Sequence, residues 1–231
     1  MLLFSLECSA AAASAAIYRD EKLLGEEFLN VPQTHSVTLL PMAKSLLEHT
    51  GISPAQIDYY AVSRGPGSFT GLRIGIAAIK GLAFPDNTPC IGVSTPEAIA
   101  YGLLGFEGTV IPMMDARCGQ VYTALFQGKD GHLTRLSEDE ALPLSELKEK
   151  LKSCTGPLWL CGDGAHLGLA AWGEELPVRM APAHLCCQRA SAVGLAAMQH
   201  LGEAVSPAAL VPCYLRPANA MTLAERQHKA E

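Results

Sequence analysis

The sequence lacks the features that mark several common protein classes. Its formal net charge is −6, which argues against a generally nucleic-acid-binding surface, because no positive excess offsets phosphate repulsion. The eight cysteines include no C-x-x-C pair, and no two histidines have the four-residue spacing of a helical metal site. Neither a zinc site nor a disulfide framework is therefore expected.

Long apolar runs are also missing. No stretch of about 20 apolar residues is present, so no membrane-spanning helix is expected. The N-terminus is apolar but has no basic region, and Glu7 interrupts its apolar run, which argues against a secretory signal. We expect a cytoplasmic protein with reduced thiols. Its 231 residues suffice for one large domain or for two lobes of about 100 residues each.

In the first half of the chain, strand and helix patterns follow one another. Alternating and continuous apolar stretches predict three antiparallel strands, a helix stopped by Gly51, a fourth strand, and a helix stopped by Pro85. A glycine-rich loop precedes the second helix. The predicted ranges are 2–6, 13–18, 23–29, 34–50, 59–63 and 70–84.

In the second half, the patterns predict the strands 90–93, 109–114, 120–127 and 158–161, and the helices 95–104, 145–152 and 188–201. Ser145 is the predicted cap of the helix that follows it. Strands mixed with helices in this way predict an α/β fold with mixed sheets in two lobes. The division between the lobes is expected near Gly102 to Gly108.

The stretch SRGPGSFTGLRIG, from Ser63 to Gly75, allows three interpretations. The first is a phosphate-binding loop. The strict G-x-x-x-x-G-K-[ST] form fails, because Leu72 and Arg73 follow Gly71. A weaker form remains open, in which free amides at the start of the helix hold an anion or a nucleotide. Its candidate residues are Gly65, Gly67, Ser68 and Thr70.

The second interpretation is a nucleophile elbow, G-x-S-x-G, which would need glycine where Pro66 stands. Ser68 also has no evident histidine and aspartate partners in the sequence. A cap by Ser68 or Thr70 on the following helix explains these hydroxyls better.

The third interpretation concerns the helix itself. Gly71, Gly75, Ala78 and Leu82 fall on one face. Each glycine costs a helix about 1 kcal/mol against alanine, so such a face suits the close approach of another backbone. The neighbour is the helix at 34–50, a second copy of the chain or a different protein, and internal packing without a partner stays open. In the partner interpretation, replacing Gly75 by a larger residue blocks helix approach but leaves the chain folded.

A family resemblance adds to these interpretations. The run from Gly65 to Gly75, GPGSFTGLRIG, resembles the signature of the TsaB (YeaZ) family of the bacterial tRNA threonylcarbamoyladenosine pathway. Further matching pieces stand in the family's order over most of the chain: His35-Ser36 with Leu39-Leu40-Pro41, Asp115-Ala116-Arg117 with Val121-Tyr122, and Tyr214-Leu215-Arg216.

The resemblance implies a two-lobed fold of the actin, Hsp70 and sugar-kinase type, whose C-terminal helix returns to the first lobe. The N-terminal lobe is then 1–104, completed by 207–231, and the C-terminal lobe is 105–206. The resemblance also implies a non-catalytic partner of TsaD, the transferase subunit, with the ATPase TsaE joining them. ATP and a metal ion act in that complex on tRNA, and this chain alone is expected to bind no cofactor.

In the family, the helices matching 35–48 and 69–84 contact TsaD, and they form a homodimer in its absence. The implied interface residues are His35, Leu39, Leu40, Ala43, Leu46, Gly71, Arg73, Ile74, Gly75, Ala78 and Lys80. Leu39 stands where the second histidine of a TsaD-like H-x-x-x-H metal site would be. Glu7-Cys8-Ser9 replaces the family's common Asp-Thr-Ser. We therefore expect neither catalytic nor metal-binding residues, and give Glu7 a surface or hydrogen-bonded role.

Several alternatives stay open. The main one is a nucleotide-binding ATPase or kinase of the same fold, and a peptidase based on Ser68 is another. The turn at Asp115 and Arg117 is either a contact site or a solvated hairpin end. The Gly-Asp-Gly at 162–164 is either a second phosphate loop or an ordinary turn. A basic patch for tRNA or for acidic residues of TsaD would consist of Arg64, Arg73 and Lys80.

Overall fold

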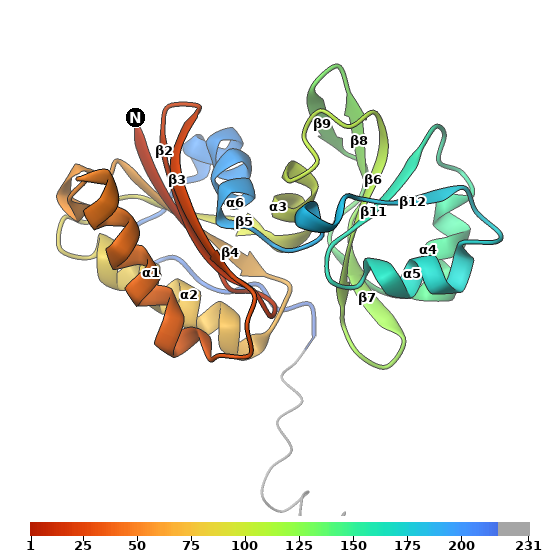
Figure 1. Cartoon of the computed structure of the whole chain (residues 1–231), viewed down its shortest axis with the longest axis horizontal. Coiled ribbons are helices and arrows are strands. Elements are labelled where there is room, and N and C mark those ends of the chain that lie inside the picture. The colour runs from red at the N-terminus through yellow and green to blue at the C-terminus, as the bar shows by residue number, and fades with distance from the viewer. Residues whose placement is uncertain (217–231) are drawn as a thin grey trace, which may run out of the picture.

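Two β-sheets lie side by side in the computed structural model, which describes residues 1–216 (Figure 1). The first sheet has the strand order β3-β2-β1-β4-β5. Its first three strands are antiparallel, as predicted, whereas β4 and β5 continue the sheet in parallel. The bounds are β1 (Leu2–Glu7), β2 (Ala13–Arg19), β3 (Lys22–Leu29), β4 (Tyr59–Gly65) and β5 (Cys90–Ser94).

Helices cover both faces of this sheet (Figure 1). On one face lie α1 (His35–Thr50) and α2 (Phe69–Ala83), and on the other lie α3 (Thr95–Tyr101) and α6 (Ala190–Ala197). Gly51 ends α1 in the left-handed region, with φ 64°, where its N–H donates to the carbonyl of Glu48. Within residues 1–216, no helix combines the length and apolarity needed to cross a bilayer.

The second sheet repeats the arrangement of the first. Its order is β10-β7-β6-β11-β12, in which β6 pairs antiparallel with β7 and parallel with β11, as β1 does with β2 and β4. The hairpin β8–β9 adds to the other end of β6. The strands are β6 (Gly108–Asp115), β7 (Gln120–Thr123), β8 (Phe126–Lys129), β9 (His132–Arg135), β10 (Glu140–Pro143), β11 (Leu158–Cys161) and β12 (Val178–Met180).

Apolar helix faces close the second lobe as well. The helices α4 (Leu144–Leu151) and α5 (Ala165–Trp172) contribute Leu147 and Trp172 to a core with the second sheet. The opposite face of the second sheet contacts α3. Ile99 of α3 and Leu103, just after its end, pack with Phe126 of β8. Because α3 also contacts β4 and β5, it joins the two lobes.

Several predicted elements differ in detail. The helix predicted at 95–104 ends at Tyr101. The range 120–127 is two strands, because β7 and β8 pair with opposite ends of β6. The helix predicted at 145–152 begins at Leu144, and Pro143 rather than Ser145 is its N-cap. The helix predicted at 188–201 is α6 followed by the 3₁₀-helix η3 (Met198–Glu203).

The chain returns to the first lobe through α6. Ser5 Oγ donates to the carbonyl of Ala190 at 2.7 Å, and the N–H of Ala190 donates to Ser14 Oγ at 2.7 Å. A returning C-terminal helix was expected, and α6 lies at that place. The lobe boundary at 206 stays a prediction, and residues 217–231 of the predicted completion lie outside the described residues.

Candidate functional site

The glycine-rich loop is a meeting point of three segments of this chain. A Cβ built on Gly65, whose φ is 126°, would lie 2.1 Å from the carbonyl oxygen of Cys213. At Gly67 and Gly71, a Cβ would lie 2.6 Å from the Ser9 oxygen and 2.1 Å from the Cys8 oxygen. Since backbone atoms cannot yield as a side chain can, these positions need glycine for the fold itself.

The amides at the start of α2 are partly used within the chain. Ser68 Oγ accepts from the N–H of Gly71 at 3.2 Å, which confirms the predicted cap. The N–H of Ser68 donates to the carbonyl of Ser9 at 2.7 Å. Among the four candidate anion-binding residues, Gly67 and Ser68 line a cleft between the lobes, and Gly65 is buried against residue 213. Their role as an anion loop stays a prediction.

The glycine face of α2 packs on its own sheet. A Cβ on Gly75 would lie 2.8 Å from Cys8 Sγ and 3.2 Å from Cγ2 of Val62, and Ala78 belongs to the first core. The interpretation in which the glycines of this face meet another chain is therefore corrected, whereas Leu82 of the same face lines an outer groove. A larger residue at position 75 would press into the chain's own core, so it would not leave the fold intact.

The implied interface residues divide into two sets. Six of them are buried in this chain: Leu39, Ala43, Leu46, Gly71, Gly75 and Ala78. The other five reach the surface at least in part: His35, Leu40, Arg73, Ile74 and Lys80. Most of the buried set is covered by the chain's own core, although Ala43 lines a groove beside α1. Membership of the exposed set in an interface stays a prediction.

The outer surface of α1 and α2 carries exposed apolar side chains, of which the sequence analysis selected Leu40 but not Val37 or Phe84. Val37 is 64% exposed, Leu40 52% and Phe84 73%. Beside them, a groove of about 670 Å³ runs between the two helices, with Leu40, Leu47 and Leu82 in its lining. We call Val37, Leu40, Phe84 and this groove the outer helix surface. Its signal in the sequence is the i, i+3 spacing of Val37 and Leu40 outside the buried stripe.

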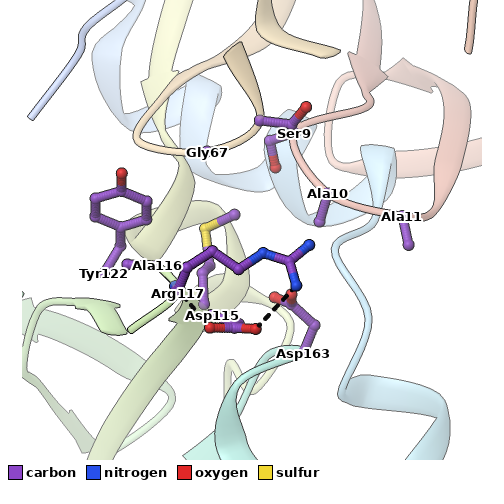
Figure 2. A pocket seen from close by; sticks show the side chains of 11 residues that line it. Ser9, Ala10, Ala11, Gly67, Asp115, Ala116, Arg117, Tyr122 and Asp163 are labelled. Atoms are coloured by element: carbon purple, nitrogen blue, oxygen red, sulfur yellow. Dashed lines mark hydrogen bonds and ion pairs between the residues drawn. The ribbon is translucent and has the colours of Figure 1, made fainter. Parts of the chain in front are cut away.

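The cleft between the lobes lies where parallel strands of both sheets end (Figure 2). Its volume is about 490 Å³. Ser9 follows β1, Gly67 follows β4, Asp115 ends β6 and Asp163 follows β11. Crevices outside the carboxyl ends of such strands are the usual ligand sites of open α/β sheets, so this cleft is the natural place to look for chemistry.

Two carboxylates face the cleft. Asp115 Oδ1 accepts from the N–H of Arg117 at 2.7 Å, and the Arg117 guanidinium lies 3.8 Å from Asp115 Oδ2 (Figure 2). Gln188 Nε2 donates to Asp163 Oδ1 at 2.6 Å. Burial raises the pKa of Asp163, although the bond from Gln188 opposes that shift. Arg117, with its side chain 87% exposed, extends into solvent from the turn.

The Gly-Asp-Gly turn at 162–164 has a packing explanation. A Cβ on Gly162 would lie 2.3 Å from the Met113 oxygen, and one on Gly164 would lie 2.9 Å from the Asp115 nitrogen. The two glycines let the turn after β11 lie directly on β6.

Glu7 is fully buried, so the predicted surface role is excluded and the hydrogen-bonded role is confirmed. Its Oε1 accepts from the N–H of Ser9 at 2.5 Å, and Ser63 Oγ donates to its Oε2. Burial raises the pKa of Glu7 above 4.5, against the effect of these bonds. The carboxyl at the end of the first strand is thus held within the chain.

These residues do not fit a metal–nucleotide centre of the kind that the wider fold suggests. Glu7 is engaged with Ser9 and Ser63, and Asp163 with Gln188. Within residues 1–216, no group of three histidine, cysteine, aspartate or glutamate side chains is placed to hold a metal ion. Ser68 has no bond to a histidine among the described residues, so a nucleophile elbow has no support either.

Comparisons with known proteins match this chain to a family model, to curated relatives and to solved structures. The family model of TsaD, tRNA N6-adenosine threonylcarbamoyltransferase, matches residues 29–153, more than half of the chain. The tRNA threonylcarbamoyladenosine biosynthesis protein TsaB of Bacillus subtilis is 31% identical over 95% of this chain and 96% of its own.

Solved structures extend the comparison. A Pseudomonas aeruginosa protein described as similar to peptidase YeaZ has a TM-score of 0.80 at 28% identity, covering 93% of this chain and 99% of its own. The activator of 2-hydroxyisocaproyl-CoA dehydratase from Clostridium difficile, solved with ADPNP, has a TM-score of 0.50 at 12% identity, covering 88% and 96%. The second likeness concerns the fold alone, which is the predicted two-lobed actin-like type.

Proposed function

This chain belongs to the TsaB (YeaZ) family, and on that premise we propose that it is a non-catalytic partner of the TsaD transferase in tRNA threonylcarbamoyladenosine biosynthesis. The printed name of the Bacillus subtilis relative supports the pathway. In this proposal TsaE joins the pair, and ATP, a metal ion and tRNA are handled by the assembled complex.

One observation carries the choice of contact surface. Val37 and Leu40 of α1 and Phe84, the residue after α2, are each more than half exposed, and all three lie in the ranges that the family resemblance implicates. Leu40 also lines the groove, and exposed apolar side chains at a groove are typical of a protein interaction site. The polar side chains of Arg73 and Lys80 lie along the same helix, α2, as a polar rim would.

The inner contacts strengthen this assignment. Because Gly71, Gly75 and Leu39 are committed to the chain's own core, a partner reaches α1 and α2 only through the outer helix surface. The same surface would hold two copies of this chain together when TsaD is absent. TsaD binding then competes with homodimer formation.

The non-catalytic part of the proposal rests on the cleft. Glu7, at the end of the first strand, is buried and bonded to Ser9 and Ser63. Asp163, in the cleft lining, is bonded to Gln188, and Asp115 accepts from the N–H of Arg117. Carboxyl oxygens that already accept hydrogen bonds within the chain are less available to a metal ion. We accordingly assign no reaction step to this chain.

The test uses a pair of exposed leucines. Leu40 is 52% exposed on α1 and Leu136 is 53% exposed in the second lobe, so Leu40→Asp and Leu136→Asp introduce the same charge at equal exposure. Light scattering after gel filtration, followed by calorimetry with TsaD, should show at least about a tenfold loss of affinity for Leu40→Asp, equivalent to about 1.4 kcal/mol. Leu136→Asp should bind as the parent does. Equal TsaD affinity of both variants would contradict the assignment.

The nucleotide-binding ATPase or kinase is kept as an alternative, because the cleft has the position of a ligand site in the fold. Calorimetry with ATP and Mg²⁺ separates the two. Saturable binding of ATP by the isolated chain would favour the alternative, and heats no larger than those of dilution would favour the partner role.

A further inference from the structure

Three signature segments that are far apart in the sequence meet at one groove beside the cleft. Phe69 comes from the glycine-rich motif, Arg117 from the Asp-Ala-Arg turn, and Tyr214 and Arg216 from the last described segment. Tyr122 of β7 completes the set. The groove has a volume of about 200 Å³. Packing of the first lobe alone does not require this meeting, because Arg117 and Tyr122 belong to the second lobe.

Aromatic rings form a platform on one side of the groove. The rings of Phe69 and Tyr214 are stacked, with centroids 4.7 Å apart and planes 29° apart. The Arg73 guanidinium lies 3.8 Å from the Phe69 ring centroid, and Arg73 Nε donates to Tyr214 Oη at 3.1 Å. These contacts hold the two rings in place, with 36% of Tyr214 left exposed.

Cationic side chains form the other side. Arg216 Nη1 donates to the carbonyl of Ala116 at 2.8 Å, and its guanidinium lies 6.0 Å from the Tyr122 ring centroid. Arg117 is almost fully exposed, and its nearest carboxylate, Asp115, is 3.8 Å away in the neighbouring cleft. None of the described residues that line this groove is acidic. On a chain of net charge −6, this is a local positive site.

From this geometry we infer that the groove binds single-stranded RNA, with phosphates at Arg117 and Arg216 and a base on the Phe69–Tyr214 platform. Stacking on aromatic rings combined with arginine contacts to phosphate is the general mode of single-strand binding. The choice of RNA among anionic ligands rests on the proposed function, whose substrate is a tRNA.

The groove's shape favours a strand over a free nucleotide. Its volume lies below the roughly 300 Å³ at which pockets begin to enclose a small molecule. The carboxylates of Asp115 and Asp163 line the adjoining cleft, where they would repel a triphosphate tail. A strand can cross the groove with one base on the platform and leave both ends in solvent.

Fluorescence anisotropy with a short, unstructured, fluorescein-labelled RNA tests the inference on the full chain. Affinity should fall with added salt, and Arg117→Ala should reduce the slope of log affinity against log salt by about 0.7, the value of one lost phosphate contact on a single strand. Arg19→Ala is the matched control. Arg19 is an exposed arginine at the C-terminal end of β2, where it pairs with Leu2 at the start of β1, and it does not line the groove. Arg117→Lys should keep most of the slope.

A second variant separates stacking from charge. Tyr214→Leu should weaken RNA binding by about fivefold or more, as expected for one lost base stack, with an unchanged salt slope. Equal salt slopes of RNA binding for Arg117→Ala and Arg19→Ala would overturn the RNA assignment. Complete displacement of the RNA probe by excess ATP would overturn it as well. Loss of TsaD binding in Arg117→Ala with RNA binding intact would assign the groove to a protein instead.

The two proposals fail separately. Leu40→Asp should weaken TsaD binding but leave RNA binding unchanged, whereas Arg117→Ala should leave TsaD binding unchanged but weaken RNA binding. If the isolated chain binds RNA but does not bind TsaD, the proposed RNA site stands and the proposed partner role is contradicted.

Discussion

The inner faces of α1 and α2 are buried in the chain's own core, whereas their outer faces are exposed. Both faces contain residues of the family motifs. On the inner face, Leu39 is 1% exposed and Gly71 lies against the backbone of Cys8. Leu40, the residue after Leu39, is 52% exposed on the outer face. The glycine signature is thus explained by the chain's own close packing, and the proposed partner contact rests on the exposed neighbours of the buried positions.

The two ends of α2 repeat this contrast in its glycines. A Cβ on Gly71 would lie 2.1 Å from the Cys8 oxygen, whereas a Cβ on Gly81 would meet no atom within 4 Å. Glycine is therefore required by packing at position 71, whereas position 81 has room for a side chain. The following predictions test this contrast, beginning with the largest effect.

Gly71→Ala should destabilise the chain most, by about 4 kcal/mol or more, the size reserved for severe steric conflicts. The added methyl would clash with the backbone oxygen of Cys8, the residue after β1, and a backbone oxygen cannot rotate away. Urea unfolding followed by circular dichroism measures the change. A Gly71→Ala chain within about 0.5 kcal/mol of the parent would show that Cys8 and α2 are not in close contact.

Leu39→Ala and Leu40→Ala compare adjacent positions with one and the same change. Leu39 is in the first core, so its truncation should cost about 3 kcal/mol through lost burial and the cavity that remains. Leu40 is exposed, and its truncation should cost less than about 0.5 kcal/mol. The same urea experiment reads both. Comparable losses for the two variants would mean that α1 is rotated relative to the sheet.

Much of the first lobe is predictable because local signals suffice there. The antiparallel start follows from three short apolar strands with a polar turn at Asp20 and Glu21, and the end of α1 follows from Gly51. The range 120–127 could not be divided, because its division depends on which end of β6 each half pairs with. That pairing depends on residues far away in the sequence, so the residues at 120–127 alone do not predict it.

The site was less predictable than the fold. Helical spacing places Gly71 and Gly75 on one face, but it does not say what that face meets, and the answer lies at Cys8, more than 60 residues away. The convergence of Phe69, Arg117 and Tyr214 depends on the relative placement of both lobes and the last described segment. Only the motifs themselves could be recognised in advance.

Glu7→Gln should make the stability of the chain less sensitive to pH. Because burial raises the folded-state pKa of Glu7 above 4.5, its stabilising contribution is complete below 4.5 and is lost as pH rises through the folded-state pKa. Gln cannot ionise, so the variant should gain on the parent by up to about 1.4 kcal/mol per pH unit within that window. Urea unfolding from pH 5 to pH 8 measures the difference.

The control for this prediction is Glu21→Gln, at the exposed turn between β2 and β3. It should leave the pH dependence as it is in the parent chain. If Glu7→Gln lost stability equally at every pH, the bonds from Ser9 and Ser63 would outweigh the cost of burying the charge.

Gly81→Ala should have the smallest effect and the opposite sign. The position is exposed inside α2, its new methyl meets nothing, and alanine restricts the unfolded chain more than glycine does. The isolated chain should therefore gain about 0.5–1 kcal/mol in urea unfolding. Calorimetry with TsaD then adds a second reading: unchanged affinity places the contact toward Leu40 and the groove, whereas a loss of affinity in a stabilised chain means that TsaD approaches the backbone at Gly81. A destabilised Gly81→Ala chain would contradict the contrast between the two ends of α2, because the outer position would then be packed as tightly as the inner one.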